Sequence, residues 1–220
     1  MKLVQYIERS LGFVKQNIYS LLGATKIQDE MYNNRQFTRT QESERIIWVD
    51  MEMTGLDPET CHILEVACII TDQHLNTIAE GPNLILHQPD NILLKMNEWS
   101  WKHHSQSGLL NASRESKITL EDAENQLMNF VKKYTPPGRC PLGGSSVYMD
   151  KLFLLKYMPT FANYMHYRII DVSTVKELAR RWYSIEGPKK LMKHRALEDI
   201  KESINELKFY KRCLFRQNIL

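Results

Sequence analysis

The chain of 220 residues has few cysteines, no long apolar run and almost no excess of charge of either sign. Its four cysteines are widely spaced without a C-x-x-C pair, which argues against a zinc knuckle or a disulfide scaffold and predicts reduced, mostly buried thiols. No apolar run approaches the roughly 18 residues of a membrane span, so we expect a soluble protein with no membrane partner. The formal net charge of +3 does not indicate a surface that coats long nucleic acids.

The first 44 residues differ from the rest of the chain. Apolar side chains recur at helical spacing over residues 3–22, and residues 26–44 are polar and aperiodic, which predicts an amphipathic helix, a linker and a single domain over residues 45–220. Because the helix is poor in acids and carries Lys and Arg, it fits either a mitochondrial targeting segment or an extra helix packed on the domain. The first interpretation predicts a mitochondrial protein, alone or with a cytoplasmic pool.

The stretch from Ile46 to Asp57 reads Ile-Ile-Trp-Val-Asp-Met-Glu-Met-Thr-Gly-Leu-Asp, an apolar strand that ends in a glycine turn. Side chains alternate along a strand, so Asp50 and Glu52 point to the same face as Trp48. Apolar residues on both faces predict a covered strand, in which two carboxylates cost several kcal/mol unless they are neutralised. Oxygen ligands in such a pair suit a hard divalent cation.

The later chain alternates further strands and helices. Strands are predicted over residues 62–71 and 75–87, paired as an antiparallel hairpin, and later over 141–147 and 167–171. Helices are predicted over 120–134, from Asp150 to about Met158, from a capping box at Thr174 and Glu177 to Trp182, and through Tyr210 at the end. Three strands followed by alternating helices and strands predict a mixed sheet covered by helices.

Three residues of these later elements complete a pattern with the first strand. Asp150 follows a strand and opens a helix, Asp199 lies one turn into the final helix, and His194 precedes it by five residues. Four converging carboxylates stay ionised only around metal ions, and two metals are the usual device for displacement at phosphorus. Taken singly, Asp150 as a helix N-cap, Asp199 as a solvated helix residue and His194 as a loop histidine are the ordinary alternatives.

This pattern, Asp-x-Glu with Thr-Gly, a later Asp and His-x-x-x-x-Asp, resembles the DEDD exonucleases of the histidine subtype. Longer stretches, such as Lys-Tyr-Met-Pro and His-Tyr-Arg-Ile-Ile-Asp-Val-Ser-Thr-Val, resemble the oligoribonuclease family from about Arg45 to Tyr210. The resemblance implies an α/β ribonuclease H-like fold with a mixed five-stranded sheet and helices on both faces. It also implies a 3′-5′ exoribonuclease that hydrolyses short oligoribonucleotides, down to dinucleotides, to nucleoside 5′-monophosphates.

The resemblance also implies a role for each site residue. Two Mg²⁺ or Mn²⁺ ions would be held by Asp50, Glu52, Asp150 and Asp199, with His194 as the general base. The resemblance assigns contacts with the bases to Leu56 and Trp99, with His104 nearby. It assigns contacts with the terminal phosphate to Ser146 and Ser173. A homodimer is implied, in which Tyr167 and Arg168 of one subunit reach the site of the other; no other protein partner is inferred.

Three positions, Ser145, Tyr148 and Met149, depart from the family pattern and bear on how the substrate end is capped. Trp99 fits core packing as well as base stacking. Two other functions stay open at this point: removal of 3′ nucleotides from longer single-stranded DNA, and a non-catalytic RNA-binding paralogue. Activity on a two-nucleotide RNA separates the first from the leading interpretation, and binding of divalent metal separates the second.

Overall fold

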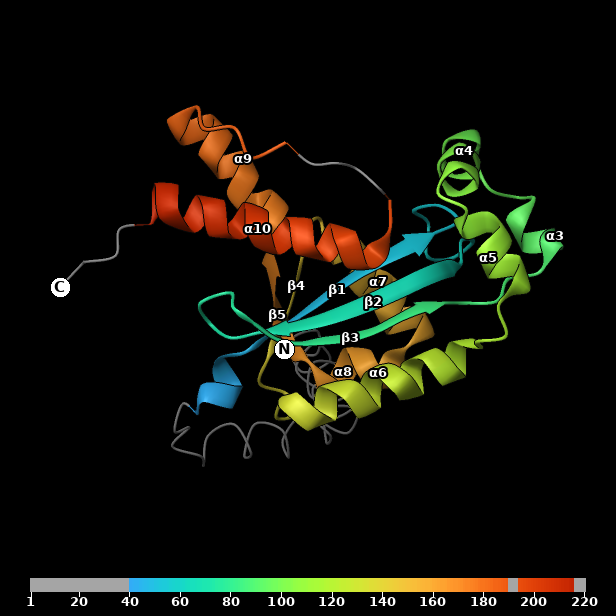
Figure 1. Ribbon diagram of the computed structural model, residues 1–220, viewed down its shortest axis with the longest axis horizontal. Coiled ribbons are helices and arrows are strands. Elements are labelled where there is room, and N and C mark those ends of the chain that lie inside the picture. Colours follow the sequence, from blue (N-terminus) through green and yellow to red (C-terminus); the bar gives the residue numbers. More distant parts are fainter. Residues whose placement is uncertain (1–39, 190–193, 216–220) are drawn as a thin grey trace, which may run out of the picture. The chain divides into compact units, whose positions relative to one another are not determined.

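The computed structural model describes residues 40–189 and 194–215. Within these residues a mixed sheet has the strand order β3-β2-β1-β4-β5, with helices on both faces (Figure 1). Its strands are β1 (Ile46–Met53), β2 (Ile63–Thr71), β3 (Thr77–Ile85), β4 (Pro141–Gly144) and β5 (His166–Asp171). The first three strands are antiparallel neighbours, whereas β4 and β5 run parallel to β1. The predicted five-stranded sheet and its hairpin are therefore confirmed. The helix predicted over residues 3–22 lies outside the described residues.

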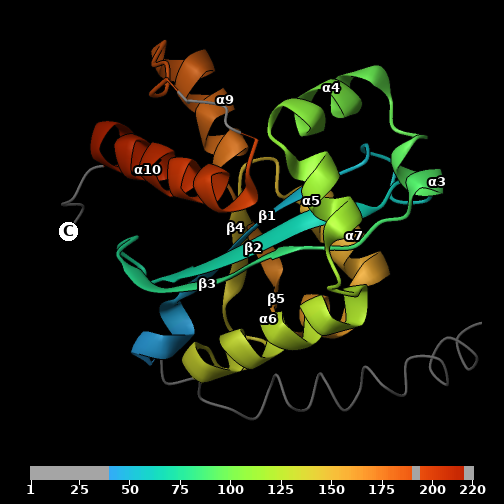
Figure 2. The same cartoon turned by 45° about the vertical axis from the view of Figure 1, so that its right-hand side comes forward.

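The helices occupy both faces and one end of the sheet. A short 3₁₀ helix, η1 (Gln41–Glu44), leads into β1, and the helices are α3 (Asp90–Leu93), α4 (Glu98–Gln106), α5 (Leu109–Glu115), α6 (Leu120–Tyr134), α7 (Tyr148–Tyr157), α8 (Pro159–Tyr164), α9 (Val172–Tyr183) and α10 (Ala196–Leu214). Figure 2 shows α6 and α10 on opposite sides of the sheet, with α4 and α5 beyond the end of β1. No helix within the described residues is long and apolar enough to span a bilayer.

The central strand β1 supplies side chains to two separate cores. Ile47, Val49 and Met51 pack with apolar residues of α6, α7 and α8. Ile46 and Trp48 pack on the other face with α9 and α10. Both layers are fully buried at their centres, so the alternation predicted for this strand is confirmed. The second layer brings α10 across the face that carries Asp50 and Glu52.

Two predicted elements differ from the structure, and one observed helix was not predicted. The strand predicted over 141–147 ends at Gly144, because Ser146 takes the left-handed backbone conformation at φ 52° and turns the chain into α7. The capping box at Thr174 was wrong: α9 begins two residues earlier at Val172, where the Asp171 carboxylate accepts a hydrogen bond from the Ser173 backbone N–H at 2.9 Å. Helix α8, opened by Pro159, was not predicted.

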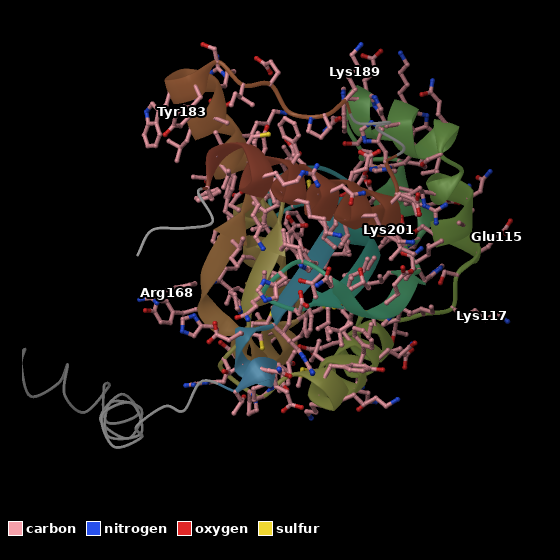
Figure 3. The ribbon with its side chains drawn as sticks, turned by 60° about the vertical axis from the view of Figure 1, so that its left-hand side comes forward. Glu115, Lys117, Arg168, Tyr183, Lys189 and Lys201 are labelled. Carbon is pink, nitrogen blue, oxygen red and sulfur yellow. The ribbon has the colours of Figure 1, made fainter. Side chains whose placement is uncertain are left out.

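Strand β5 forms one edge of the sheet. Tyr167 and Ile169 of this strand and Tyr148, Leu152 and Leu155 of α7 are large apolar side chains exposed on the surface. Arg168 projects outward from the same strand (Figure 3). A sheet edge that is rich in exposed apolar and aromatic side chains is suited to contact with another chain.

The four cysteines are free thiols. Cys68 and Cys140 are buried, Cys61 is half-buried and Cys213 is exposed. The sequence predicted mostly buried thiols, and two of the four are fully buried.

Candidate active site

Three of the predicted site residues meet where the C-terminal half of β1 faces the start of α10. Ligand atoms of Glu52, His194 and Asp199 all lie within 4.8 Å of one another. Glu52 is placed by β1, and Asp199 by the first turn of α10. The backbone N–H of Asp199 donates a hydrogen bond to the Arg195 carbonyl at 3.0 Å. His194 lies just before the helix in the left-handed conformation, at φ 51°. A non-glycine residue in that conformation is a strained feature that concentrates at functional sites.

Asp150 joins the site from α7. Its Oδ1 accepts a hydrogen bond from the backbone N–H of Met51 at 3.0 Å, so this carboxylate lies against β1 between Asp50 and Glu52. The side chain is buried and makes no cap hydrogen bond at the start of α7, whose N-cap is Val147. The alternative of Asp150 as an N-cap is therefore wrong, and a buried acid whose charge acts on Glu52 calls for a counter-charge.

Asp50 lies two residues before Glu52 on the same face of β1 and is half-buried. Its main-chain partner in β2 is Ala67, whereas Glu52 is opposite Glu65. Of the four predicted acids, the structure brings Glu52 and Asp199 together with His194, whereas Asp50 and Asp150 lie along the same strand outside that group.

Burial, with a smaller contribution from neighbouring charges, raises the pKa of two of the acids. Burial, followed by the negative charges of Asp199, Glu65 and Asp150, raises the pKa of Glu52 to about 8, and the Arg195 guanidinium opposes this shift. Burial likewise raises the pKa of Asp150 to about 7, with Asp171 adding to the shift and hydrogen bonds opposing it. Without a bound cation these carboxyls hold protons near neutral pH.

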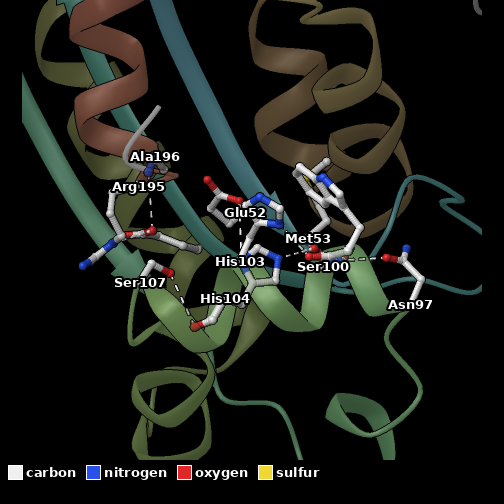
Figure 4. A network of polar contacts seen from close by, with 11 residues as sticks. Glu52, Met53, Asn97, Ser100, His103, His104, Ser107, Arg195 and Ala196 are labelled. Carbon is white, nitrogen blue, oxygen red and sulfur yellow. Dashed lines mark hydrogen bonds and ion pairs between the residues drawn. The ribbon is translucent and has the colours of Figure 1, made fainter. Parts of the chain in front are cut away.

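Two histidines of α4 lie near the site: His104 beside Glu52, and His103 beside His194. His104 is buried; its Nε2–H donates to the Met53 carbonyl at 2.9 Å, while its Nδ1 lies 3.8 Å from a Glu52 oxygen (Figure 4). Burial lowers the pKa of His104, which keeps the ring neutral. His104 was predicted near the bases of a substrate, which stays a prediction; in the structure its ring lies beside Glu52.

Trp99 and His103 form an aromatic cluster with His194. The Trp99 and His103 rings stack with centroids 4.0 Å apart, and both meet the His194 ring edge-on, at 5.7 Å and 4.8 Å. Trp99 is 59% exposed, so packing in the core does not explain it. His103 was not predicted as a site residue, although its position four residues after Trp99 on one helix was a usable signal.

Leu56 lies on the loop after β1 and is 69% exposed. Gly55 beside it approaches the neighbouring segments so closely that a Cβ there would lie 2.7 Å from Cys61 Sγ and 3.6 Å from Asn97 Nδ2. Asn97 is the N-cap of α4, the helix that carries Trp99. Leu56 and Trp99 therefore extend from two adjoining segments as an open apolar rim beside the acids.

Ser146 and Ser173, predicted to contact a terminal phosphate, are brought together by Asp171. The Asp171 Oδ1 accepts hydrogen bonds from both backbone N–H groups at 2.9 Å, and the two hydroxyl oxygens lie 3.0 Å apart. They line an open pocket of about 420 Å³ whose wall also includes Tyr148 and Arg181. Asp171 was missed in the sequence, where it appears as the last residue of a strand.

The other two residues that depart from the family pattern flank Ser146 and Tyr148 in the sequence. The hydroxyl oxygens of Ser145 and of Ser203 on α10 lie 2.9 Å apart, and Met149 of α7 is partly buried and packs against the core.

Tyr167 and Arg168 are not brought to the acids of their own chain. Ile169 pairs with Leu142, and Leu142 pairs with Ile47, so Arg168 is level with Ile46. It therefore lies two strands away from β1 and is displaced from Asp50 by four residues towards the start of that strand. This corresponds to about 13 Å along the strands and about 10 Å across them. The Arg168 guanidinium lies 5.3 Å from the Tyr167 ring centroid, an exposed pair at the sheet edge.

Comparison with known proteins identifies the group to which this chain belongs. Residues 47–207 match the Exonuclease family of the RNase T type. Human mitochondrial oligoribonuclease is 57% identical over 180 residues, covering 80% of this chain and 76% of the relative, and oligoribonuclease of Haemophilus influenzae is 52% identical over 172 residues, covering 77% and 94%.

A similar fold occurs in a solved structure of zinc-bound Escherichia coli exonuclease I with single-stranded DNA, at TM-score 0.60 and 16% identity. The likeness covers 79% of this chain and only 41% of that longer one, and it supports the ribonuclease H-like fold. The identities over most of both sequences, together with the matched exonuclease domain, show that the chain belongs to the oligoribonuclease family of exonucleases.

Proposed function

We propose that this chain is a metal-dependent 3′-5′ exoribonuclease that hydrolyses short oligoribonucleotides, down to dinucleotides, to nucleoside 5′-monophosphates. Its family membership makes it a nuclease, and the observation that carries the mechanism is the convergence of Glu52, His194 and Asp199 within 4.8 Å. The short substrate follows from the two serines at Asp171, which offer hydrogen bonds to one terminal phosphate, and from the small net charge, which favours few phosphate contacts.

The residues present fit divalent ions. Asp50, Glu52, Asp150 and Asp199 would hold two Mg²⁺ or Mn²⁺ ions, because carboxylate oxygens are the ligands that these hard cations prefer. The raised pKa of Glu52 supports this assignment, since it reports a carboxyl that lacks a compensating positive charge. When bound, such ions supply an activated water and stabilise the charge that develops on the leaving oxygen.

The protein residues position the reactants. His194, at the mouth of the acidic cluster, accepts the proton of the attacking water. The exposed Trp99 ring and the Leu56 side chain hold the bases next to the scissile phosphate. Ser146 and Ser173 bind the terminal phosphate at the opposite end of the substrate, which limits the length of the oligoribonucleotide.

A homodimer completes this proposal. The exposed side chains of β5 and α7 supply an apolar surface at the sheet edge, and the stacked Tyr167 and Arg168 extend from it to the site of a partner subunit. Light scattering is expected to give twice the chain mass of 25.9 kDa. A monomer that retains full activity would exclude this part of the proposal.

We also propose a mitochondrial location, as in the names of the human, bovine and mouse relatives. A fluorescent reporter that carries residues 1–45 should accumulate in mitochondria, and a diffuse signal would assign this segment another role.

The function is tested by a series of RNA lengths. With Mg²⁺, a 5′-phosphorylated diribonucleotide is expected to be cleaved to mononucleotides faster than RNA of about ten nucleotides, because only short substrates satisfy the serine pair and the acids together. A single-stranded DNA of about twenty nucleotides tests the alternative of general 3′ trimming. Faster cleavage of the long strand would contradict the proposal.

Replacing Trp99 by alanine is expected to weaken the dinucleotide reaction through binding. Base stacking on an aromatic ring contributes about 1 to 3 kcal/mol, so kcat/KM should fall roughly five- to 150-fold, with most of the change in KM. Trp182 on α9 is the matched control, since it is also a highly exposed tryptophan, at 67% against 59%. Equal effects of W99A and W182A on kcat/KM would show that Trp99 does not stack on the substrate.

A further inference from the structure

We infer that the ion pair between the buried Glu65 and the half-buried Arg195 is a positioning device for the general base: it fixes the chain at the start of α10 so that His194 and Asp199 face Glu52. This inference rests on the proposed function. The two residues lie 130 positions apart in the sequence, and neither is among the predicted ligands or substrate contacts.

Glu65 is placed directly behind the site. It is fully buried in β2, and it is the residue opposite Glu52 in the antiparallel register of β1 and β2. Opposite residues of adjacent strands point to the same face, so two acids are neighbours there. A buried, unpaired carboxylate in that position is strongly unfavourable, which requires a specific partner.

Arg195 is that partner, and it makes a forked contact. Its Nε lies 3.2 Å and 3.1 Å from the two Glu65 oxygens, and its Nη2 donates to Oε1 at 2.8 Å. The backbone N–H of Ala196 donates to the same carboxylate at 3.4 Å. Such a bidentate arrangement fixes orientation as well as distance, which a single point charge does not.

The carboxylate therefore also serves the start of the helix. Arg195 is the N-cap residue of α10 and makes no side-chain cap of its own, whereas Glu65 places a negative charge at this N-terminus. His194 directly precedes this anchored residue and takes its left-handed conformation there. Anchoring Arg195 and Ala196, which Figure 4 shows at the start of the helix, thus limits where the His194 ring and, one turn later, the Asp199 carboxylate can lie.

A second ion pair on the same helix provides a comparison. Lys201 also connects α10 to the sheet, with its Nζ 3.2 Å from Glu80 on β3. The two basic side chains are similarly exposed, at 38% for Lys201 and 35% for Arg195, but Glu80 is 52% exposed whereas Glu65 is fully buried. Exposed pairs contribute little, and this one lies more than a turn beyond the base. If α10 needed only a general tether, both pairs would matter equally for the reaction.

The test compares Arg195→Lys, Arg195→Gln and Lys201→Ala in the full-length, Mg²⁺-loaded protein, with kcat expressed per folded molecule. Arg195→Lys keeps the charge and loses the fork, so it is expected to fold and to lower kcat about tenfold; Arg195→Gln should lower it up to about a hundredfold. KM for the dinucleotide should stay within about threefold, because the base and phosphate contacts lie elsewhere. Lys201→Ala should leave kcat within about twofold.

Hydrogen exchange of the metal-free proteins gives a readout that does not depend on catalysis. Faster amide exchange confined to residues 194–199 in both Arg195 variants, and absent in Lys201→Ala, is expected. Lower melting temperatures with unchanged kcat per folded molecule would overturn the inference and leave a purely structural ion pair. If the wild type fails to cleave RNA, the proposed function fails, and unchanged exchange at residues 194–199 in the variants would then reject the positioning role separately.

Discussion

Replacing Glu52 by glutamine is expected to abolish hydrolysis and, at the same time, to raise the melting temperature of the metal-free protein at pH 8. The carboxylate is held in a buried position among Asp199, Glu65 and Asp150, which together with burial raise its pKa to about 8. The amide has nearly the same shape and no charge to repel. Loss of a ligand should remove several kcal/mol of charge stabilisation from the transition state, or roughly a thousandfold in kcat.

The control for this variant is Glu80→Gln, a surface acid of β3 whose side chain is 52% exposed. Its activity and melting temperature should change little, because exposed ion pairs contribute about 0 to 1 kcal/mol. Asp150→Asn provides a second case, since the amide oxygen can still accept the bond from the Met51 N–H. A Glu52→Gln protein that keeps a tenth of the activity, or that melts earlier than wild type without metal, would contradict the assignment.

The second large effect is a dependence of metal-free stability on pH. The folded-state pKa values of Glu52 and Asp150 are raised to about 8 and about 7 from ordinary values of 4.5 and 3.8. The folded protein therefore holds these protons after the unfolded chain has released them, and its stability falls as the pH rises from about 4 to about 8. Each pKa unit corresponds to about 1.4 kcal/mol, so the two shifts together predict a decline on the order of 10 kcal/mol over this range.

Melting temperatures in EDTA and in excess Mg²⁺ measure this effect. In EDTA the melting temperature is expected to fall by several degrees between pH 6 and pH 8, since 1 kcal/mol shifts it by about 2 to 4 °C in a domain of this size. Mg²⁺ should reduce the fall, because bound ions favour the ionised carboxyls. The Glu52→Gln variant in EDTA should show a shallower fall than wild type. A melting temperature that rises or stays constant in EDTA would show that these carboxyls are not protonated in the folded protein.

The fold could be predicted where local pattern decides it. The apolar alternation of Ile46 to Met53 fixed both faces of β1, and the helix at Leu120–Tyr134 was predicted with its observed ends, where Thr119 and Asp122 form a capping box. The start of α9 was misplaced because Asp171 and Thr174 are both good N-cap residues, and only the strand that precedes Val172 decides between them. Choices of that kind depend on tertiary structure.

In the candidate site, too, some residues follow from local sequence pattern and others only from tertiary structure. The period of one strand places Asp50 and Glu52 on one face. Asp150, His194 and Asp199 were singled out by their positions at helix starts, and the family resemblance supplied their roles. Glu65 could not be predicted in the same way, because its partner Arg195 is 130 residues later and the surrounding residues read as an ordinary buried strand. Pairing across such a distance leaves no periodic signal in one sequence.

The central claim, that four carboxylates form a site for two divalent ions, is tested most directly by calorimetric titration of the metal-free protein with Mn²⁺. Two ions per chain are expected to bind at pH 7.5, with release of protons, because Glu52 and Asp150 are partly protonated beforehand. The Glu52→Gln variant should lose at least one of the two binding events and release fewer protons. Absence of Mn²⁺ binding by the wild type, or identical binding by Glu52→Gln, would contradict the two-metal account and favour a non-catalytic RNA-binding protein.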